Sequence, residues 1–366
     1  MNKKIKIILG VVVVISVVWG IYSVTKKPSE PVSGEPIKIG VITALTGGLS
    51  FWGESTNLGV ELIQKDLIEQ GINVEFIVED AQVDPKMALS AAQKLVSIDG
   101  VSAIYSEFNP AAIAISSFVK DKDIIHLYNA AVISPLQDSD NIYKSYLDYE
   151  KSCQEVAQIA KNRGIDKVGV LKLNLEFGDL CLKGIKNVYG DNTFVESYNA
   201  GTTDFRTLLT KLKTNDVQAI FNVSFQPDSL ASLKNMNELG MDAIFVGVSE
   251  IVSPDIIDEY TGILEGSVMF GLPVVSLAFE NKIKERFPNR TIGENQYQAL
   301  AAAYIHLGQI AKAFNDCGKD LGCVRSEINN AKPNSIMGFK RFNDNIAEFD
   351  LLIQEWIDGK FIEIKK

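Results

Sequence analysis

Apolar runs and amphipathic runs alternate along most of this chain. Residues 37–43 (IKIGVIT) are nearly all β-forming and carry no charge after Lys38, as is typical of a strand buried on both faces in a parallel sheet. A polar stretch rich in Gly, Ser and Thr follows, and apolar residues then recur at helical spacing at Leu58, Leu62, Ile63 and Leu67. The pattern predicts a strand, a polar loop and a helix in succession.

The same alternation continues along the first half of the chain. VEFIVED and VSAIYS predict two further strands, and between them Asp84 and Pro85 have the form of an N-cap followed by proline in the first helical turn. SEFNPAA repeats this arrangement with Asn109 as the predicted cap and Pro110 after it, and DIIHLYNAAVISP adds an apolar strand with a loop of small residues. Strands that alternate with helices predict a parallel sheet covered on both faces.

Several of these segments together resemble a known family. IGVITALTGGLSFWGE, GVELIQKDLIEQGI, EFIVEDAQVDPKMALSAAQKLV and VSAIYSEFNPAAIA are similar to type I periplasmic binding proteins of the leucine/isoleucine/valine class, the extracytoplasmic receptors of ABC transporters. The later segment AGTTDFRTLLTKLK also matches closely, and the similarity extends from about Ile37 to Lys365. The resemblance implies a protein that captures a small molecule between two lobes.

The length of 366 residues also favours two lobes over a single core. We predict an α/β fold of two doubly wound parallel-sheet lobes joined by a three-strand hinge that closes around a ligand. The first lobe is expected to comprise 37–146 plus about 275–330, and the second 147–274 plus about 331–366.

The resemblance also implies a ligand site. Loops matching Asn109 and residues 130–132 hold the ligand's carboxylate in the family through backbone N–H groups and hydroxyls, although Val132 stands where a hydroxyl residue is usual. A helix that begins at Asn109 would offer N–H groups to an anion, but an ordinary capped helix fits the same letters. The residues expected to bind the ligand are Trp52, Asn109, Ala130, Ala131, Val132, Phe177, Phe225, Ser249 and Glu250.

Three positions in the second lobe bear on the ligand's identity. Phe177 and Phe225 fall where leucine-type receptors commonly carry tyrosines, and Ser249 falls where a glutamate usually meets the ammonium group. The adjacent Glu250 is the predicted cation partner, because burial of an ammonium group without a carboxylate is costly. If Glu250 points away, a small organic acid or amide fits better than an α-amino acid. Phe51, Trp52, Phe177 and Phe225 could clamp the ligand's body or simply belong to the core.

The N-terminal segment differs in character from the rest. Ile7 to Val24 is an unbroken run of apolar or small residues, and its 18 residues would span about 27 Å as a helix, close to the hydrocarbon thickness of a bilayer. It lacks an A-x-A cleavage pattern, and no cysteine lies near it to carry a lipid. We predict an uncleaved signal anchor over 1–25, a tether over 26–36 and a globular part on the extracytoplasmic side.

Composition narrows the partners and the chemistry. A net charge of -10 argues against a nucleic-acid partner. The spacing of Cys317 and Cys323 permits a short disulfide loop, Cys153 and Cys181 form a second candidate pair, and four free thiols are the alternative. With two histidines in the chain, a zinc site is not expected.

Nothing in the sequence indicates catalysis. The chain has no G-x-G-x-x-G, Walker or G-x-S-x-G motif, so no catalytic residue, cofactor or metal is predicted. The favoured hypothesis is a substrate-binding protein that captures a small amino acid, branched-chain or similar, and interacts with ABC permease subunits. An anchored ligand sensor and a subunit with a degenerate site are the alternatives.

Overall fold

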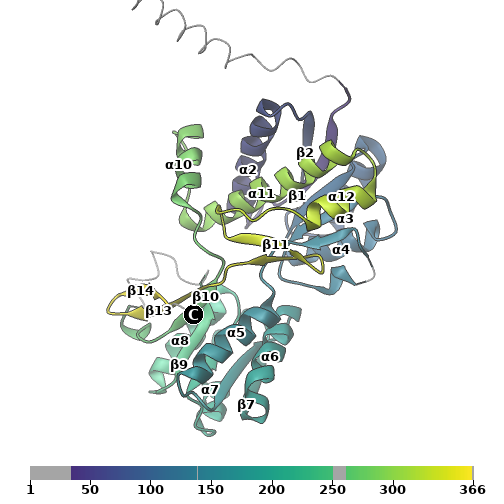
Figure 1. Ribbon diagram of the computed structural model, residues 1–366. Coiled ribbons are helices and arrows are strands. Elements are labelled where there is room, and N and C mark those ends of the chain that lie inside the picture. The colour runs from purple at the N-terminus through teal and green to yellow at the C-terminus, as the bar shows by residue number, and fades with distance from the viewer. Residues whose placement is uncertain (1–33, 138, 250–260, 365–366) are drawn as a thin grey trace, which may run out of the picture.

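The computed structural model describes residues 34–137, 139–249 and 261–364. In these residues, two seven-stranded sheets flanked by helices form the centres of two lobes (Figure 1). This arrangement confirms the predicted fold class. The predicted anchor, most of the predicted tether and Glu250 lie outside the described residues.

The first sheet has the strand order β11-β12-β5-β4-β3-β1-β2. Strands β1 to β5 are parallel, and the chain winds outward from β1 in both directions, so the winding reverses between β1 and β3. In open α/β sheets, ligands bind beyond the carboxyl ends of the strands at such a point. The strands are β1 (Ile37–Thr43), β2 (Val74–Asp80), β3 (Ala103–Glu107), β4 (Ile125–Asn129), β5 (Ile142–Lys144), β11 (Phe339–Asn343) and β12 (Ile346–Phe349).

Helices cover both faces of this sheet, which explains why its strands are apolar throughout. Ile39 and Val41 pack into one core with α2 and α11, whereas Ile42 and Ile104 pack into another with α3 and α4. The helices are α2 (Ser50–Glu69), α3 (Pro85–Lys94), α4 (Asn109–Val119), α10 (Leu277–Arg286), α11 (Glu294–Cys317) and α12 (Leu321–Asn329), with short turns η1 (Leu95–Asp99) and η2 (Ser134–Leu136).

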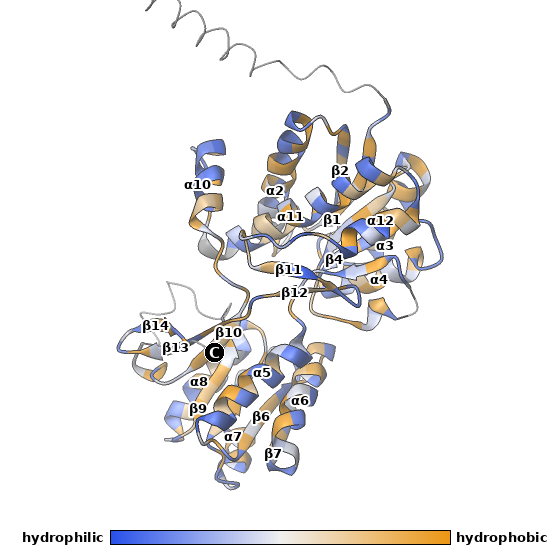
Figure 2. Cartoon of the chain, viewed as in Figure 1, coloured by the Kyte–Doolittle hydropathy of each residue, from blue (hydrophilic) through white to orange (hydrophobic). Residues whose placement is uncertain are grey.

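The second sheet has the order β14-β13-β10-β9-β8-β6-β7. Its strands and helices enclose a single large core, and the central strands are strongly hydrophobic while the helices mix hydrophobic and hydrophilic positions (Figure 2). Its elements are α5 (Tyr149–Asn162), β6 (Val168–Leu173), α6 (Glu176–Tyr189), η3 (Gly190–Asn192), β7 (Thr193–Tyr198), α7 (Arg206–Lys213), β8 (Ala219–Phe221), α8 (Gln226–Glu238), β9 (Ile244–Val248), η5 (Thr261–Ile263), β10 (Val268–Gly271), β13 (Leu352–Ile357) and β14 (Lys360–Glu363).

The chain passes between the sheets three times, after β5, after β10 and after β12. The third crossing corrects one prediction. The hairpin β11–β12 pairs with β5 in the first sheet through Ile346, so residues 339–349 do not belong to the second lobe as expected. The pattern of apolar residues identified these strands, but it contains no information on which sheet they join.

Turn chemistry shapes this C-terminal region. Asp344 and Asn345 both have positive φ, of 49° and 60°, and close the β11–β12 hairpin. Asp358 and Gly359 do the same between β13 and β14, with φ of 50° and 80°. Two successive left-handed residues suit the tight turns that match the twist of paired strands.

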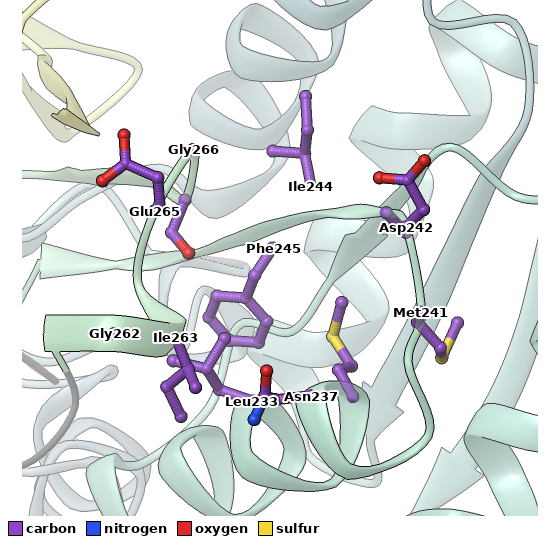
Figure 3. A pocket seen from close by; sticks show the side chains of 13 residues that line it. Leu233, Asn237, Met241, Asp242, Ile244, Phe245, Gly262, Ile263, Glu265 and Gly266 are labelled. Atoms are coloured by element: carbon purple, nitrogen blue, oxygen red, sulfur yellow. The ribbon is translucent and has the colours of Figure 1, made fainter. Parts of the chain in front are cut away.

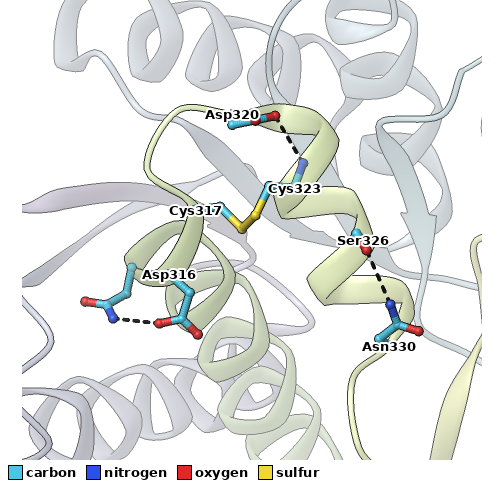
Figure 4. The surroundings of a disulfide bond; sticks show 7 residues. Asp316, Cys317, Asp320, Cys323, Ser326 and Asn330 are labelled. Atoms are coloured by element: carbon cyan, nitrogen blue, oxygen red, sulfur yellow. Dashed lines mark hydrogen bonds between the residues drawn. A yellow bond between two sulfur atoms is a disulfide. The ribbon is translucent and has the colours of Figure 1, made fainter.

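The four cysteines form two disulfides, in the pairs that the sequence suggested. Cys153–Cys181 joins α5 to α6, and Cys317–Cys323 joins the end of α11 to α12 (Figure 4). The second loop is also held by Asp320, whose side chain accepts a hydrogen bond from the N–H of Cys323 at 3.1 Å.

Within the ranges that the structure describes, no helix is both long enough and apolar enough to cross a bilayer.

Candidate ligand-binding site between the lobes

The carboxyl edge of the first sheet ends in a polar row. Thr43 of β1 is in register with Asp80 of β2, and Glu107 of β3 is in register with Asn129 of β4. Glu107 is buried, and its Oε2 accepts hydrogen bonds from the hydroxyls of Thr43 at 2.5 Å and Thr56 at 2.8 Å. These bonds tie β1, β3 and α2 together at the point where the strand order reverses.

The second carboxylate oxygen of Glu107, Oε1, has fewer hydrogen bonds than Oε2. In the described part of the chain, Glu107 Oε1, Tyr105 Oη and Asn129 Oδ1 are buried without a hydrogen-bond partner. Burial raises the pKa of Glu107 to about 7, because the charged form loses its hydration. Glu107 was not among the predicted site residues, although it is a carboxylate at the end of an otherwise uncharged strand.

Asn109 acts differently from the prediction. Phe108 is the N-cap of α4, with φ 70° and ψ 142°, and Asn109 is the first helical residue. The Oδ1 of Asn109 accepts a hydrogen bond from the N–H of Ala131 at 2.8 Å. Asn109 therefore fixes the loop after β4, and the Ala131 N–H is already used within the protein.

The loop after β4 reaches the second lobe. Ala131 and Ile133 pack against the second-lobe core. Glu176, the first residue of α6, accepts hydrogen bonds from the N–H of Ile133 at 2.6 Å, the N–H of Ser134 at 2.8 Å and the hydroxyl of Ser134 at 2.7 Å. This contact between the carboxyl ends of β4 and β6 was not predicted from the sequence.

Aromatic rings line the carboxyl end of the second sheet. The centroids of Tyr146 and Tyr149 lie 6.2 Å apart, those of Tyr149 and Phe177 5.5 Å, and those of Phe177 and Phe225 5.8 Å. Phe177 is buried, whereas Phe225 is 49% exposed at the start of α8. The two predicted phenylalanines are thus in contact, one in the core and the other at the surface.

A second aromatic pair lies at the start of α2 in the first lobe. Trp52 is partly buried and meets Phe51 edge to face at 6.0 Å. Phe51 is 46% exposed, and its carbonyl accepts a hydrogen bond from Gln296 of α11 at 3.1 Å. The pair is therefore anchored to the first lobe by the backbone and leaves one ring accessible.

Comparison with known proteins decides the family. The family model described as periplasmic binding protein matches residues 36–360. This chain belongs to the periplasmic binding protein family. The family consists of substrate-binding proteins of transporters, not enzymes, and this binding protein falls in its branched-chain amino acid ABC transporter group.

Relatives of this binding protein differ in what they bind. The leucine-, isoleucine-, valine-, threonine-, and alanine-binding protein of Pseudomonas aeruginosa is 25% identical over 353 residues, which cover 90% of this chain and 92% of the relative. A leucine binding protein from Thermotoga maritima has a TM-score of 0.73 at 16% identity and covers 90% of this chain and 98% of its own. A solute binding protein from R. palustris, solved with 4-hydroxybenzoate, has a TM-score of 0.73 at 18% identity. The match covers 91% of this chain and 96% of that protein's chain.

The other predicted ligand contacts of this binding protein lie in the loop after β4 and at the end of β9. Ala130 and Val132 are buried in the first lobe, and the carbonyl of Val132 accepts a hydrogen bond from the Tyr128 hydroxyl at 3.0 Å. Ser249 follows β9, and its side chain lies against Gly271, where any added Cβ would meet the Ser249 hydroxyl. Its neighbour Glu250, the predicted ammonium partner, lies outside the described residues.

A pocket lies away from the candidate site. It has a volume of about 390 Å³ and lies in the second lobe among Leu233, Met241, Phe245 and Ile263 (Figure 3). It opens beside the residues that precede β9 and β10, which is the amino end of these strands and not the end that carries the aromatic rings.

In the parts of the chain that the structure describes, no group of three or more His, Cys, Asp or Glu is placed to hold a metal ion.

Proposed function

We propose that this binding protein captures a small amino acid, branched-chain or similar, between its lobes and presents it to the permease subunits of an ABC transporter. The observation that carries the proposal is the pairing of two surfaces at the carboxyl ends of the two sheets. The first lobe supplies a loop of small residues after β4, and the second supplies the aromatic row that ends at the exposed Phe225. Such a pair suits a ligand with a carboxylate at one end and an apolar body at the other.

The carboxylate would be met by backbone donors. The Ala131 N–H is bound to Asn109, which leaves the N–H groups of Ala130 and Val132, both of which lack an acceptor among the described residues. Backbone donors do not depend on the side chain, so the absence of a hydroxyl at Val132 does not remove them. The names of the relatives from Pseudomonas aeruginosa and Thermotoga maritima support an amino acid as the ligand.

A small aromatic acid is the second candidate. Ser249 stands where the family's ammonium-binding glutamate is expected, and a benzoate-type ligand needs no ammonium partner. A planar ring would also stack against Phe225, the exposed end of the row formed with the buried Tyr149 and Phe177. The complex of the R. palustris protein with 4-hydroxybenzoate supports this candidate.

Ligand-dependent unfolding separates the two candidates. Residues 36–366 are purified and their thermal midpoint is recorded with about 1 mM of each amino acid, amino-acid amide, benzoate and small organic acid. A ligand with a dissociation constant near 1 μM stabilises by about 4 kcal/mol and raises the midpoint by several degrees. A shift with leucine, isoleucine or valine supports the amino-acid proposal, whereas shifts with benzoates alone would replace it by the second candidate.

We also propose that residues 1–25 anchor the protein, with the lobes on the extracytoplasmic side. The support is the uncharged run from Ile7 to Val24 after three lysines. The full chain is then expected to sediment with membranes and to keep its own N-terminus, while 36–366 stays in the supernatant. An extracytoplasmic sensor that couples to a membrane partner instead of a permease is the alternative, and ligand uptake by the reconstituted transporter distinguishes the two.

A further inference from the structure

Glu176 makes a contact between the two lobes. It begins α6 of the second lobe, whereas Ile133 and Ser134 belong to the loop that follows β4 of the first lobe. Its Oε1 accepts two backbone N–H groups and its Oε2 accepts the Ser134 hydroxyl, at 2.6 to 2.8 Å. Three donors converge on one carboxylate, and hydrogen bonds to an ionised acceptor are the strong ones.

The loop that Glu176 holds is the loop proposed to bind the ligand. Its other end is fixed by Asn109, which accepts the N–H of Ala131 at 2.8 Å. The loop is therefore attached to the first lobe at residue 131 and to the second lobe at residues 133 and 134. A shift of α6 relative to the first sheet would break the second attachment and leave the first intact.

Glu176 also interacts electrostatically with Lys144, which lies at the first crossing between the lobes. Lys144 is fully buried at the end of β5, and its Nζ donates hydrogen bonds to the carbonyls of Tyr146, at 3.0 Å, and Leu147 in the crossing segment. Burial lowers the pKa of Lys144 to about 7, and the carboxylates of Asp148 and Glu176 oppose this effect. Glu176 thus lies close enough to the hinge to favour its buried cation.

We propose that Glu176 is a positioning residue for ligand capture: its carboxylate clasps Ile133 and Ser134 when the lobes meet and so stabilises the closed state. The inference rests on the proposed function. The opposite role would be a plug, in which the carboxylate occupies the place of the ligand's own. The clasp agrees better with the geometry, because Glu176 uses the donors of residues 133 and 134 and leaves the N–H groups of Ala130 and Val132 to the ligand.

Asp179 provides a matched control. It lies in the same first turn of α6 and carries the same charge, but its ion pair is with Lys172 of its own lobe, at 2.7 Å. Glu176→Ala and Asp179→Ala therefore remove the same favourable charge from the start of the helix. Only the first of them removes a contact between the lobes.

Lobe closure is measured first, because it does not need the ligand to be known. Spin labels are attached at the exposed positions Ser90→Cys of the first lobe and Lys186→Cys of the second, in the full chain in detergent, and distances are recorded by pulsed electron resonance. We expect Glu176→Ala to shift the distances toward an open population and Asp179→Ala to leave them unchanged. An unchanged distribution in Glu176→Ala would overturn the clasp, whether or not any ligand binds.

Binding kinetics give the second readout, with leucine and 4-hydroxybenzoate as the probes. For a probe that binds, Glu176→Ala should raise the dissociation rate about tenfold with little change in the association rate, because the clasp acts after the encounter. Ser134→Ala, which removes one donor, should give about a threefold rise, and the double variant should be less than additive. Faster association in Glu176→Ala with an unchanged dissociation rate would show a plug instead. Failure of both probes to bind the unaltered protein would count against the proposed function. The spin-label distances would still test the clasp in that case.

Discussion

The environment of Glu107 shows how a single buried carboxyl group links the sequence to stability. Its pKa is raised by burial from 4.5 to about 7, so the folded state holds the proton more tightly than the unfolded chain does. This contribution to stability is complete below pH 4.5 and is lost as the pH rises through 7. Above pH 7, the folded protein therefore carries a buried negative charge that the unfolded chain would hydrate.

Glu107→Gln should remove that cost. The amide oxygen can accept from the hydroxyls of Thr43 and Thr56, and the new N–H group can donate toward the unpartnered oxygens of Tyr105 and Asn129. We expect the variant to be more stable than the unaltered protein by about 1 to 3 kcal/mol at pH 8, with a smaller difference at pH 5. Thermal midpoints at both values provide the measurement. A difference that does not change with pH would mean that Glu107 is ionised throughout.

Two buried histidines act in the opposite direction. Burial lowers the pKa of His126 to about 3 and that of His306 to about 4, so both are neutral in the folded protein. Stability that depends on their neutral form is present above pH 6.5 and is lost as the pH falls toward 4. The thermal midpoint should therefore fall between pH 6.5 and 4, and replacement of His126 by Gln, which keeps a donor and an acceptor for Ser106 and Ser116, should flatten that fall. An equally steep fall in the variant would assign the acid sensitivity to other groups.

At the level of elements, the two disulfides should differ in their effect. Cys153 and Cys181 are 28 residues apart and join α5 to α6, whereas Cys317 and Cys323 are 6 apart. Loop-closure entropy predicts that loss of the first costs about 3.5 kcal/mol and loss of the second about 2. Paired Cys→Ala variants compared by thermal unfolding test this order. If loss of the Cys317–Cys323 pair is the more damaging, local packing at α12 would outweigh chain entropy.

The elements also show what sequence patterns can and cannot predict. Alternation of apolar strands with amphipathic helices predicted both sheets, because each strand needs both faces covered. The hairpin β11–β12 was placed in the wrong lobe, since Phe339 and Phe342 look no different in sequence from Ile353 and Trp356. The Glu176 contact was missed for a related reason. It joins residues 42 positions apart from different lobes, and no local pattern records such a pairing.

At the scale of the whole molecule, the proposed site combines a loop of the first lobe with an aromatic row of the second. The resemblance to the family predicts the loop of residues 130–132 and the aromatic positions as ligand contacts, but it does not predict how exposed each side chain is. Phe177 is core and Phe225 is half exposed, although the sequence predicts both as ligand contacts. Exposure of a side chain depends on the packing of all the elements around it, so it follows from the complete fold and not from the motif.

Phe225 is therefore the side chain with which to test the aromatic surface. Because it is 49% exposed, Phe225→Ala should leave the thermal midpoint of the free protein nearly unchanged, while a ligand that packs on the ring loses about 1 to 1.5 kcal/mol, or about five- to tenfold in affinity. Leu277→Ala is the control, since Leu277 is 68% exposed on α10 of the first lobe. Isothermal titration with whichever compound raises the midpoint measures both. A larger loss for benzoates than for leucine would show that the aromatic row selects planar rings, and unchanged affinity for every ligand would mean that the ligand lies away from the second-lobe aromatic row.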